Sequence, residues 1–145
     1  TNISFVGGIL TRPIKLIVVD DEEAVQFIFE DQFEKEILGK ELELLYFSRG
    51  HALMSFLNDK EVECSEIIVL SDIKMPGLDG VSLSQFLTSK YPQIEVYLTS
   101  AQLYKEDDIR LKEAGIKGFL PKPIDFFLLK NMIKTKKQSS QKGLL

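Results

Sequence analysis

The sequence is poor in the residues from which disulfides and cysteine or histidine metal sites are built. Its 145 residues include one cysteine, Cys64, one histidine and no tryptophan. A single cysteine can form no disulfide within the chain and has no second thiol at metal-ligand spacing. The sequence therefore argues against a disulfide-rich secreted fold, and a reducing compartment, the cytoplasm, is expected.

Long hydrophobic runs are also absent. Every apolar stretch is far shorter than the roughly 20 residues that a membrane-spanning helix needs. No basic leader precedes a hydrophobic segment at the N-terminus. We expect a soluble protein that carries no export signal and makes no membrane contact.

Basic residues are scarce over most of the chain. The net charge is −4, although residues 130–145 contain five lysines and no acid. The body is thus acidic, which argues against direct binding of nucleic acid. The basic segment 135–145 has no interleaved aromatic residues, so it indicates a tail or linker rather than a nucleic-acid or membrane patch.

Between residues 15 and 134, short apolar runs alternate with segments of helical periodicity. The expected strands are 16–19, 41–47, 67–71, 95–99 and 118–120, and the expected helices are 24–38, 52–57, a segment around 83–87, 106–114 and 124–134. Short connections and right-handed crossovers predict an α/β fold, a five-stranded parallel sheet doubly wound as (βα)5 with helices on both faces. One domain is expected over 15–134, after a loose N-terminal arm at 1–14.

Three aspartates follow the two most apolar strands. Asp20 and Asp21 come after the run 16–19, and Asp72 comes after the run 67–71. Carboxyl ends of parallel strands meet at one edge of a sheet, where open α/β folds bind ligands. At ~4 Å and an effective dielectric of ~20, each pair of carboxylates would repel by about 4 kcal/mol, which a hard divalent cation removes. The cluster predicts a Mg²⁺ site, with helix capping as the alternative for the first two acids.

Two further polar groups mark the ends of the last two strands. Thr99 and Ser100 close the strand at 95–99, and Lys122 follows the strand at 118–120. An acid pair, a lone acid, a hydroxyl and a lysine therefore share one rim of the sheet, at the ends of the first, third, fourth and fifth strands. This order resembles the response-regulator receiver domain of two-component signalling systems.

The resemblance covers residues 15–134 and is strongest in two segments. Residues 72–80, Asp-Ile-Lys-Met-Pro-Gly-Leu-Asp-Gly, match the family's phosphoacceptor loop almost residue for residue, and residues 114–123 match its fifth-strand signature nearly as well. The resemblance implies a flavodoxin-like fold and a signalling phosphoacceptor rather than an enzyme. Its phosphoryl group would come from a sensor histidine kinase or a phosphotransfer protein.

The resemblance also implies a role for each residue of the rim. Asp72 is then the nucleophile that accepts the phosphoryl group. Asp20, Asp21, Asp72 and the main-chain carbonyl of Lys74 would hold Mg²⁺, with water in the remaining positions. Lys122 would pair with the acceptor carboxylate and then with a phosphoryl oxygen, and its peptide bond to the following proline is expected to be cis.

A conformational switch is expected at the hydroxyl. The family places its switch hydroxyl directly before a small residue, which favours Ser100 before Ala101. Thr99, on the opposite face of the strand, stays the alternative. Phosphorylation adds about −1.5 to −2 charge. Ser100 would then hydrogen-bond a phosphoryl oxygen, and the ring of Phe119 would fill the space that the hydroxyl leaves.

The last predicted helix contains more apolar residues than one buried face needs. They are Ile124, Phe126, Phe127, Leu128, Leu129, Met132 and Ile133. This excess indicates a partner surface or a homodimer through the last helix and the fifth strand, with ordinary burial as the alternative.

Two other functions explain fewer of these residues. A receiver-like protein-binding module that is not phosphorylated would not need the complete set of acids, hydroxyl and lysine. An aspartyl-phosphate hydrolase would need a second acid two residues after its nucleophile, where this chain has Lys74.

Overall fold

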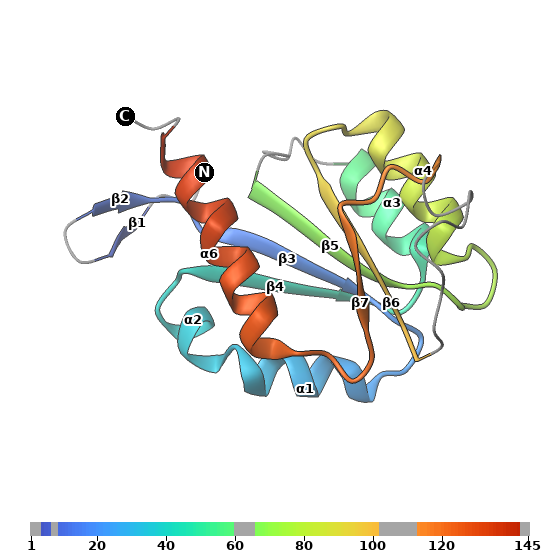
Figure 1. The fold of residues 1–145 in the computed structure, drawn as a ribbon, viewed down its shortest axis with the longest axis horizontal. Coiled ribbons are helices and arrows are strands. Elements are labelled where there is room, and N and C mark those ends of the chain that lie inside the picture. Colours follow the sequence, from blue (N-terminus) through green and yellow to red (C-terminus); the bar gives the residue numbers. More distant parts are fainter. Residues whose placement is uncertain (1–3, 7–8, 60–65, 102–112, 143–145) are drawn as a thin grey trace.

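A computed structural model of the chain describes residues 4–6, 9–59, 66–101 and 113–142. At its centre lies a five-stranded sheet in the order β4-β3-β5-β6-β7 (Figure 1). The strands are β3 (Ile14–Val19), β4 (Leu42–Phe47), β5 (Ile67–Asp72), β6 (Glu95–Ser100) and β7 (Gly118–Pro121). Every pairing in this sheet is parallel, so the predicted α/β fold with a five-stranded parallel sheet is confirmed.

The helices form two layers. They are α1 (Ala24–Gln32), α2 (Glu34–Leu38), α3 (Gly50–Asn58), α4 (Gly80–Lys90) and α6 (Phe126–Lys142). Helices α1 and α6 cover one face of the sheet, and α3 and α4 cover the other (Figure 1). The helix predicted at 24–38 is in fact two, α1 and α2, because the chain leaves helical geometry at Phe33, whose ring is buried in the core. The helix predicted at 106–114 falls almost wholly outside the described residues.

Strand β3 shows why the apolar runs are continuous. Leu16 and Val18 pack with residues of α1 and α6, whereas Ile17 and Val19 pack with residues of α3 and α4. All four side chains are buried. A central strand covered on both faces needs an apolar residue at every position, which is the pattern that predicted it. The run ends where Asp20 leaves the sheet.

Both ends of the chain contain more regular structure than the arm and tail expected from the sequence. Within residues 1–14, β1 (Ser4–Val6) and β2 (Ile9–Thr11) pair as an antiparallel hairpin that extends beyond the sheet (Figure 1). Helix α6 continues past the expected end at Lys134 to Lys142. No glycine or proline interrupts this stretch, and its lysine and glutamine residues favour helix.

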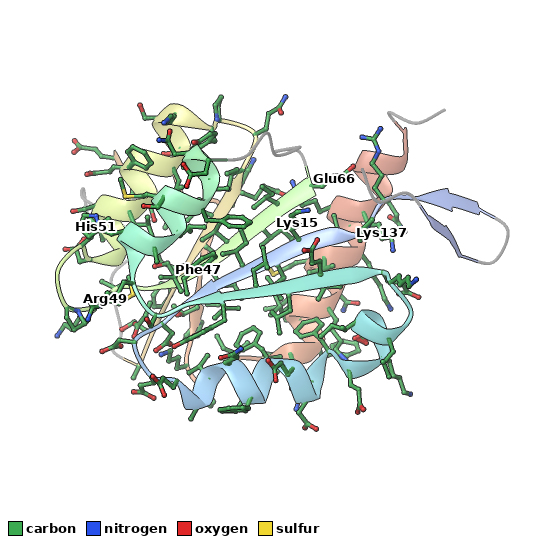
Figure 2. All side chains as sticks on the ribbon, turned by 180° about the vertical axis from the view of Figure 1, so that it is seen from behind. Lys15, Phe47, Arg49, His51, Glu66 and Lys137 are labelled. Carbon is green, nitrogen blue, oxygen red and sulfur yellow. The ribbon has the colours of Figure 1, made fainter. Side chains whose placement is uncertain are left out.

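Ion pairs fasten both of these segments to the amino edge of the sheet. Arg12 Nη1 lies 3.3 Å from Glu66 Oε1, and Lys136 Nζ lies 2.7 Å from Glu95 Oε2. Figure 2 shows Glu66 at this edge and Phe47 at the opposite one, where the strands end. The terminal segments therefore lie away from the strand-end aspartates. Among the described helices, none has the length and apolar character needed to cross a membrane.

Candidate metal centre

The structure places the three strand-end aspartates together at the carboxyl edge of the sheet. Asp20, Asp21 and Asp72 each offer a carboxylate oxygen, and these atoms lie within 4.8 Å of one another. Strands β3 and β5 are neighbours in the sheet, which brings their final residues side by side. Asp20 is only 2% exposed, whereas Asp72 is half-buried and Asp21 is exposed.

Contacts at four atoms hold Asp20 in place. Its N–H donates to the carbonyl oxygen of Phe47 at 3.1 Å, and its own carbonyl oxygen accepts a hydrogen bond from the Tyr46 phenol. Its Oδ1 accepts from the N–H of Glu22 at 2.9 Å, and its Oδ2 accepts from Lys122 Nζ at 2.7 Å. Asp20 is therefore a fixed acid, and the exposed Asp21 beside it has the freedom to turn toward a ligand.

The loop that leaves β5 fixes Asp72. The N–H of Ile73 donates to the carbonyl oxygen of Thr99 at 3.1 Å, and the N–H of Gly80 donates to the carbonyl oxygen of Ile73 at 2.8 Å. A Cβ atom on Gly80 would lie 2.1 Å from the carbonyl oxygen of Asp72, so no larger residue fits there without a shift of the backbone. Gly80, the last residue of the 72–80 segment, thus allows helix α4 to begin directly against the main chain of Asp72.

Lys122 reaches the acids from the end of β7. Its Nζ lies 2.7 Å from Oδ2 of Asp20 and 3.4 Å from Oδ2 of Asp72. Its main-chain N–H donates to the carbonyl oxygen of Ser100 at 2.9 Å, which ties it to β6. The bond to Pro123 is cis, as the resemblance implies. Sequence reasoning predicts the contact with Asp72 but misses the shorter contact with Asp20.

Burial and charge perturb the titration of this group of residues. Burial raises the pKa of Asp72; the positive charge of Lys122 opposes the rise, and the negative charge of Asp20 adds to it. For Lys122 burial acts toward a lower pKa, but the hydrogen bonds and charges of the two aspartates outweigh burial, and the pKa is raised. Additional positive charge beside Asp72 would favour its ionised form.

The donor set fits a hard divalent cation. Three carboxylates and one ammonium group leave an excess of negative charge at the cluster, and carboxylate oxygens are the protein ligands that Mg²⁺ prefers. Lys74, whose carbonyl the resemblance adds to the set, lies exposed in the loop two residues after Asp72. The described side chains could therefore hold a divalent cation, with a lysine adjacent.

The two hydroxyl residues at the end of β6 are both buried and lie on opposite faces of the strand. Thr99 pairs with Asp72 in the register of β5 and β6. Ser100 shares the face of Leu98, which packs in one apolar cluster with Phe119. The structure thus places Ser100 on the side of the sheet where Phe119 packs and Thr99 on the side of α1 and α6.

A cavity of about 250 Å³ opens beside the cluster, between α1 and the beginning of α6. Its polar lining residues are Asp20, Glu22, Thr99 and Lys122, and the remainder of the lining is apolar. Sequence reasoning anticipates neither this cavity nor the part played by Tyr46. The one available signal for Tyr46 is its place near the carboxyl end of a strand that neighbours the strand of Asp20.

Comparison with known proteins matches these features to one family. The family described as "Response regulator receiver domain" matches residues 16–134. The DNA-binding transcriptional regulator NtrC of Escherichia coli (strain K12) is 28% identical over 108 residues, which cover 74% of this chain and 21% of NtrC. The heme response regulator HssR of Staphylococcus epidermidis is 31% identical over 110 residues, which cover 76% of this chain and 45% of HssR. The chain thus spans about a fifth of the length of NtrC and less than half that of HssR.

Solved structures share the fold. Response regulator protein TrrA from Thermotoga maritima, in complex with Mg²⁺-BeF, matches with a TM-score of 0.69 at 20% identity, over 85% of this chain and 98% of that one. The signal receiver domain of an HD domain-containing protein from Pseudomonas fluorescens Pf-5 matches with a TM-score of 0.71 at 20% identity, over 99% of this chain and 96% of that one.

Proposed function

This chain belongs to the response regulator receiver domains, and we propose that Asp72 is the residue at which it accepts a phosphoryl group in a Mg²⁺-dependent reaction. Receiver domains are signalling phosphoacceptors that take this group from histidine kinases. The donor to this chain is then the phosphohistidine of a sensor histidine kinase or of a phosphotransfer protein. The observation that carries the proposal is the convergence of Asp20, Asp21 and Asp72 within 4.8 Å, with Lys122 in contact with two of them.

Four groups would hold Mg²⁺ in this proposal. Asp21 would ligate directly, Asp20 directly or through water, Asp72 through one carboxylate oxygen, and Lys74 through its main-chain carbonyl. When bound, the ion supplies positive charge against the phosphoryl oxygens. The exposure of Asp21 and the fixed position of Asp20 support this division, because one acid is free to meet the ion and the other is held in place.

The chemical step uses the carboxylate of Asp72 as nucleophile. A carboxylate oxygen forms a bond to phosphorus while the P–N bond to the donor imidazole breaks, and the electron pair of that bond stays on the ring nitrogen. Asp72 must be ionised to attack, which burial opposes and Lys122 favours. Lys122 then contacts a phosphoryl oxygen of the product as a point charge. Attack by water later restores the aspartate and releases phosphate, so self-phosphotransfer and autodephosphorylation are the only reactions proposed for this domain.

We propose that Ser100 is the switch hydroxyl. Its hydroxyl would move to hydrogen-bond a phosphoryl oxygen, and Phe119 would move into the space that it leaves. The shared face of Ser100, Leu98 and Phe119 supports this coupling. Thr99 is the alternative hydroxyl, supported by its register with Asp72. A two-state repacking of this kind needs only a few kcal/mol of bias from the phosphoryl group.

Exposed apolar residues indicate where a partner other than the phosphodonor would bind. Phe127 and Leu128 at the start of α6 are 79% and 47% exposed. We propose that this helix and β7 form the surface through which the domain meets a second copy or an output partner. Direct contact with nucleic acid is not proposed, because most of the chain is acidic. The proposed compartment is the cytoplasm, in keeping with the single cysteine.

Intact mass spectrometry tests the central proposal. Wild-type protein incubated with acetyl phosphate and Mg²⁺ should gain one phosphoryl group per chain, and it should gain none without the metal. Asp72→Asn should remain unmodified. Asp59→Asn is the matched control, because Asp59 is an exposed acid at the end of α3, and this variant should react as the wild type does.

Two results would overturn the proposal. One is equal phosphorylation of Asp72→Asn, which would place the acceptor elsewhere. The other is a folded wild-type protein that gains no phosphoryl group in the presence of Mg²⁺, which is the behaviour of a receiver-like binding module.

A further inference from the structure

We propose that Tyr46 is a positioning residue of the metal centre, whose phenol holds the main chain between Asp20 and Asp21 in the orientation that binds Mg²⁺. This inference deepens the proposed function and rests on the magnesium site described there. It concerns a residue of β4, a strand that supplies none of the acids.

The contact joins two neighbouring strands at their carboxyl ends. Tyr46 is the penultimate residue of β4 and pairs with Val18 in the register of β3. Its hydroxyl donates to the carbonyl oxygen of Asp20, and the next residue, Phe47, accepts the N–H of Asp20 at 3.1 Å. Phe47 is visible at this edge of the sheet in Figure 2. The last two residues of β4 thus hold both main-chain polar groups of Asp20.

The Asp20 carbonyl belongs to the peptide group that joins the two metal-binding acids. Fixing this oxygen fixes the plane of that peptide, and with it the direction in which both side chains leave the main chain. The effect matters most for Asp21, because no described residue hydrogen-bonds its carboxylate and it is exposed. Within the described part of the chain, the orientation of the main chain is therefore what constrains the position of the Asp21 carboxylate.

A neutral donor suits this position. A phenol is an uncharged O–H donor at neutral pH. A lysine or arginine here would add positive charge that repels the metal ion, whereas a phenol supplies a hydrogen bond without that charge.

The test is Tyr46→Phe, which removes one oxygen and keeps the ring that packs against the core. We expect Mg²⁺ binding to weaken about five-fold, the effect of one hydrogen bond, in isothermal titration calorimetry with MgCl₂. Tyr97→Phe is the matched control, because Tyr97 is also a partly buried tyrosine packed against the same cluster but lies on β6. Its Mg²⁺ affinity should equal that of the wild type.

The Mg²⁺ affinity, compared with the unfolding temperature of the metal-free protein, separates positioning from a general effect on stability. Tyr46→Phe should weaken Mg²⁺ binding in protein that is still fully folded at the temperature of the titration, and Tyr97→Phe should not. A purely structural role for Tyr46 would lower the unfolding temperature of the metal-free protein and leave the Mg²⁺ affinity unchanged.

The outcomes distinguish this inference from the proposed function. If wild-type protein binds Mg²⁺ and Tyr46→Phe binds it equally well, the inference fails and the proposed function stands. If Tyr97→Phe weakens binding as much as Tyr46→Phe does, the inference also fails. If folded wild-type protein binds no Mg²⁺, the metal centre itself is wrong, and both fall together.

Discussion

The ammonium group of Lys122 lies 2.7 Å from Oδ2 of Asp20. This contact is shorter than the 3.4 Å contact between the same ammonium and Oδ2 of Asp72. The lysine therefore neutralises the most buried acid of the cluster and touches the proposed acceptor at the same time. We therefore expect metal affinity, ionisation of the proposed acceptor and stability to be coupled through this one side chain.

Replacing Lys122 by Gln should destabilise the metal-free protein more than the Mg²⁺-bound protein. Asp20 is buried and would lose a charged donor, so we expect a loss of about 1–3 kcal/mol in the free energy of unfolding. Mg²⁺ should restore part of the loss, because the ion replaces the missing positive charge. Urea denaturation with and without Mg²⁺ measures both effects. An equal loss under the two conditions would contradict the coupling.

Replacing Gly80 by Ala should disturb the acceptor loop. The added Cβ would lie 2.1 Å from the carbonyl oxygen of Asp72, so the backbone must shift, and we expect a loss of about 1–3 kcal/mol together with slower phosphorylation. Gly118→Ala is the control, since its Cβ would meet only the Tyr97 ring at 3.4 Å. Urea denaturation and the rate of acetyl phosphate labelling are the measurements. Equal unfolding free energies and equal labelling rates for the two variants would contradict the close approach of residue 80 to the Asp72 carbonyl oxygen.

Alkaline pH should lower stability through Tyr97. Burial and then the charge of Glu95 raise its pKa above 10.0 in the folded protein. The folded state therefore holds the phenolic proton more tightly, and this contribution to stability is complete below pH 10 and is lost as the pH rises through the raised pKa. Tyr97→Phe should show a shallower loss of unfolding free energy than the wild type above about pH 10. If the unfolding free energy of the two proteins falls equally with pH in this range, Tyr97 contributes nothing to the loss of stability.

The two hydroxyls of β6 should differ in their effect on Phe119. Beryllofluoride with Mg²⁺, present in the TrrA structure, serves as a phosphoryl mimic. In wild-type protein and in Thr99→Ala, adding it should shift the aromatic NMR signals of Phe119, and in Ser100→Ala the shift should be much smaller. Loss of the shift in Thr99→Ala alone would make Thr99 the switch hydroxyl.

The predictable part of the fold and the site came from local pattern combined with topology. Continuous apolar runs indicate parallel strands that are buried on both faces. Because such strands end at one edge of the sheet, the sequence predicts that Asp20 and Asp72 lie close together. The position of Lys122 at that edge follows from the same rule.

The remainder depends on contacts between distant residues. The hydrogen bond from Tyr46 to Asp20 arises from the register of β4 against β3, which no local pattern specifies. Local propensity favours the extension of helix α6 past Lys134, but the contact of Lys136 with Glu95 on another element, which adds to it, has no local signal. The break between α1 and α2 accompanies burial of Phe33, a consequence of tertiary packing. Each of these features is a tertiary contact that overrides or extends local propensity.

The measurement that tests the account most directly is the identification of the modified residue. Protein labelled with acetyl phosphate and Mg²⁺ is reduced with borohydride, which converts an aspartyl phosphate to homoserine, and its peptides are sequenced by mass spectrometry. We predict homoserine at position 72 alone, and none in unlabelled protein or in Asp72→Asn. Homoserine at Asp20 or Asp21, or its absence from labelled wild-type protein, would contradict the account.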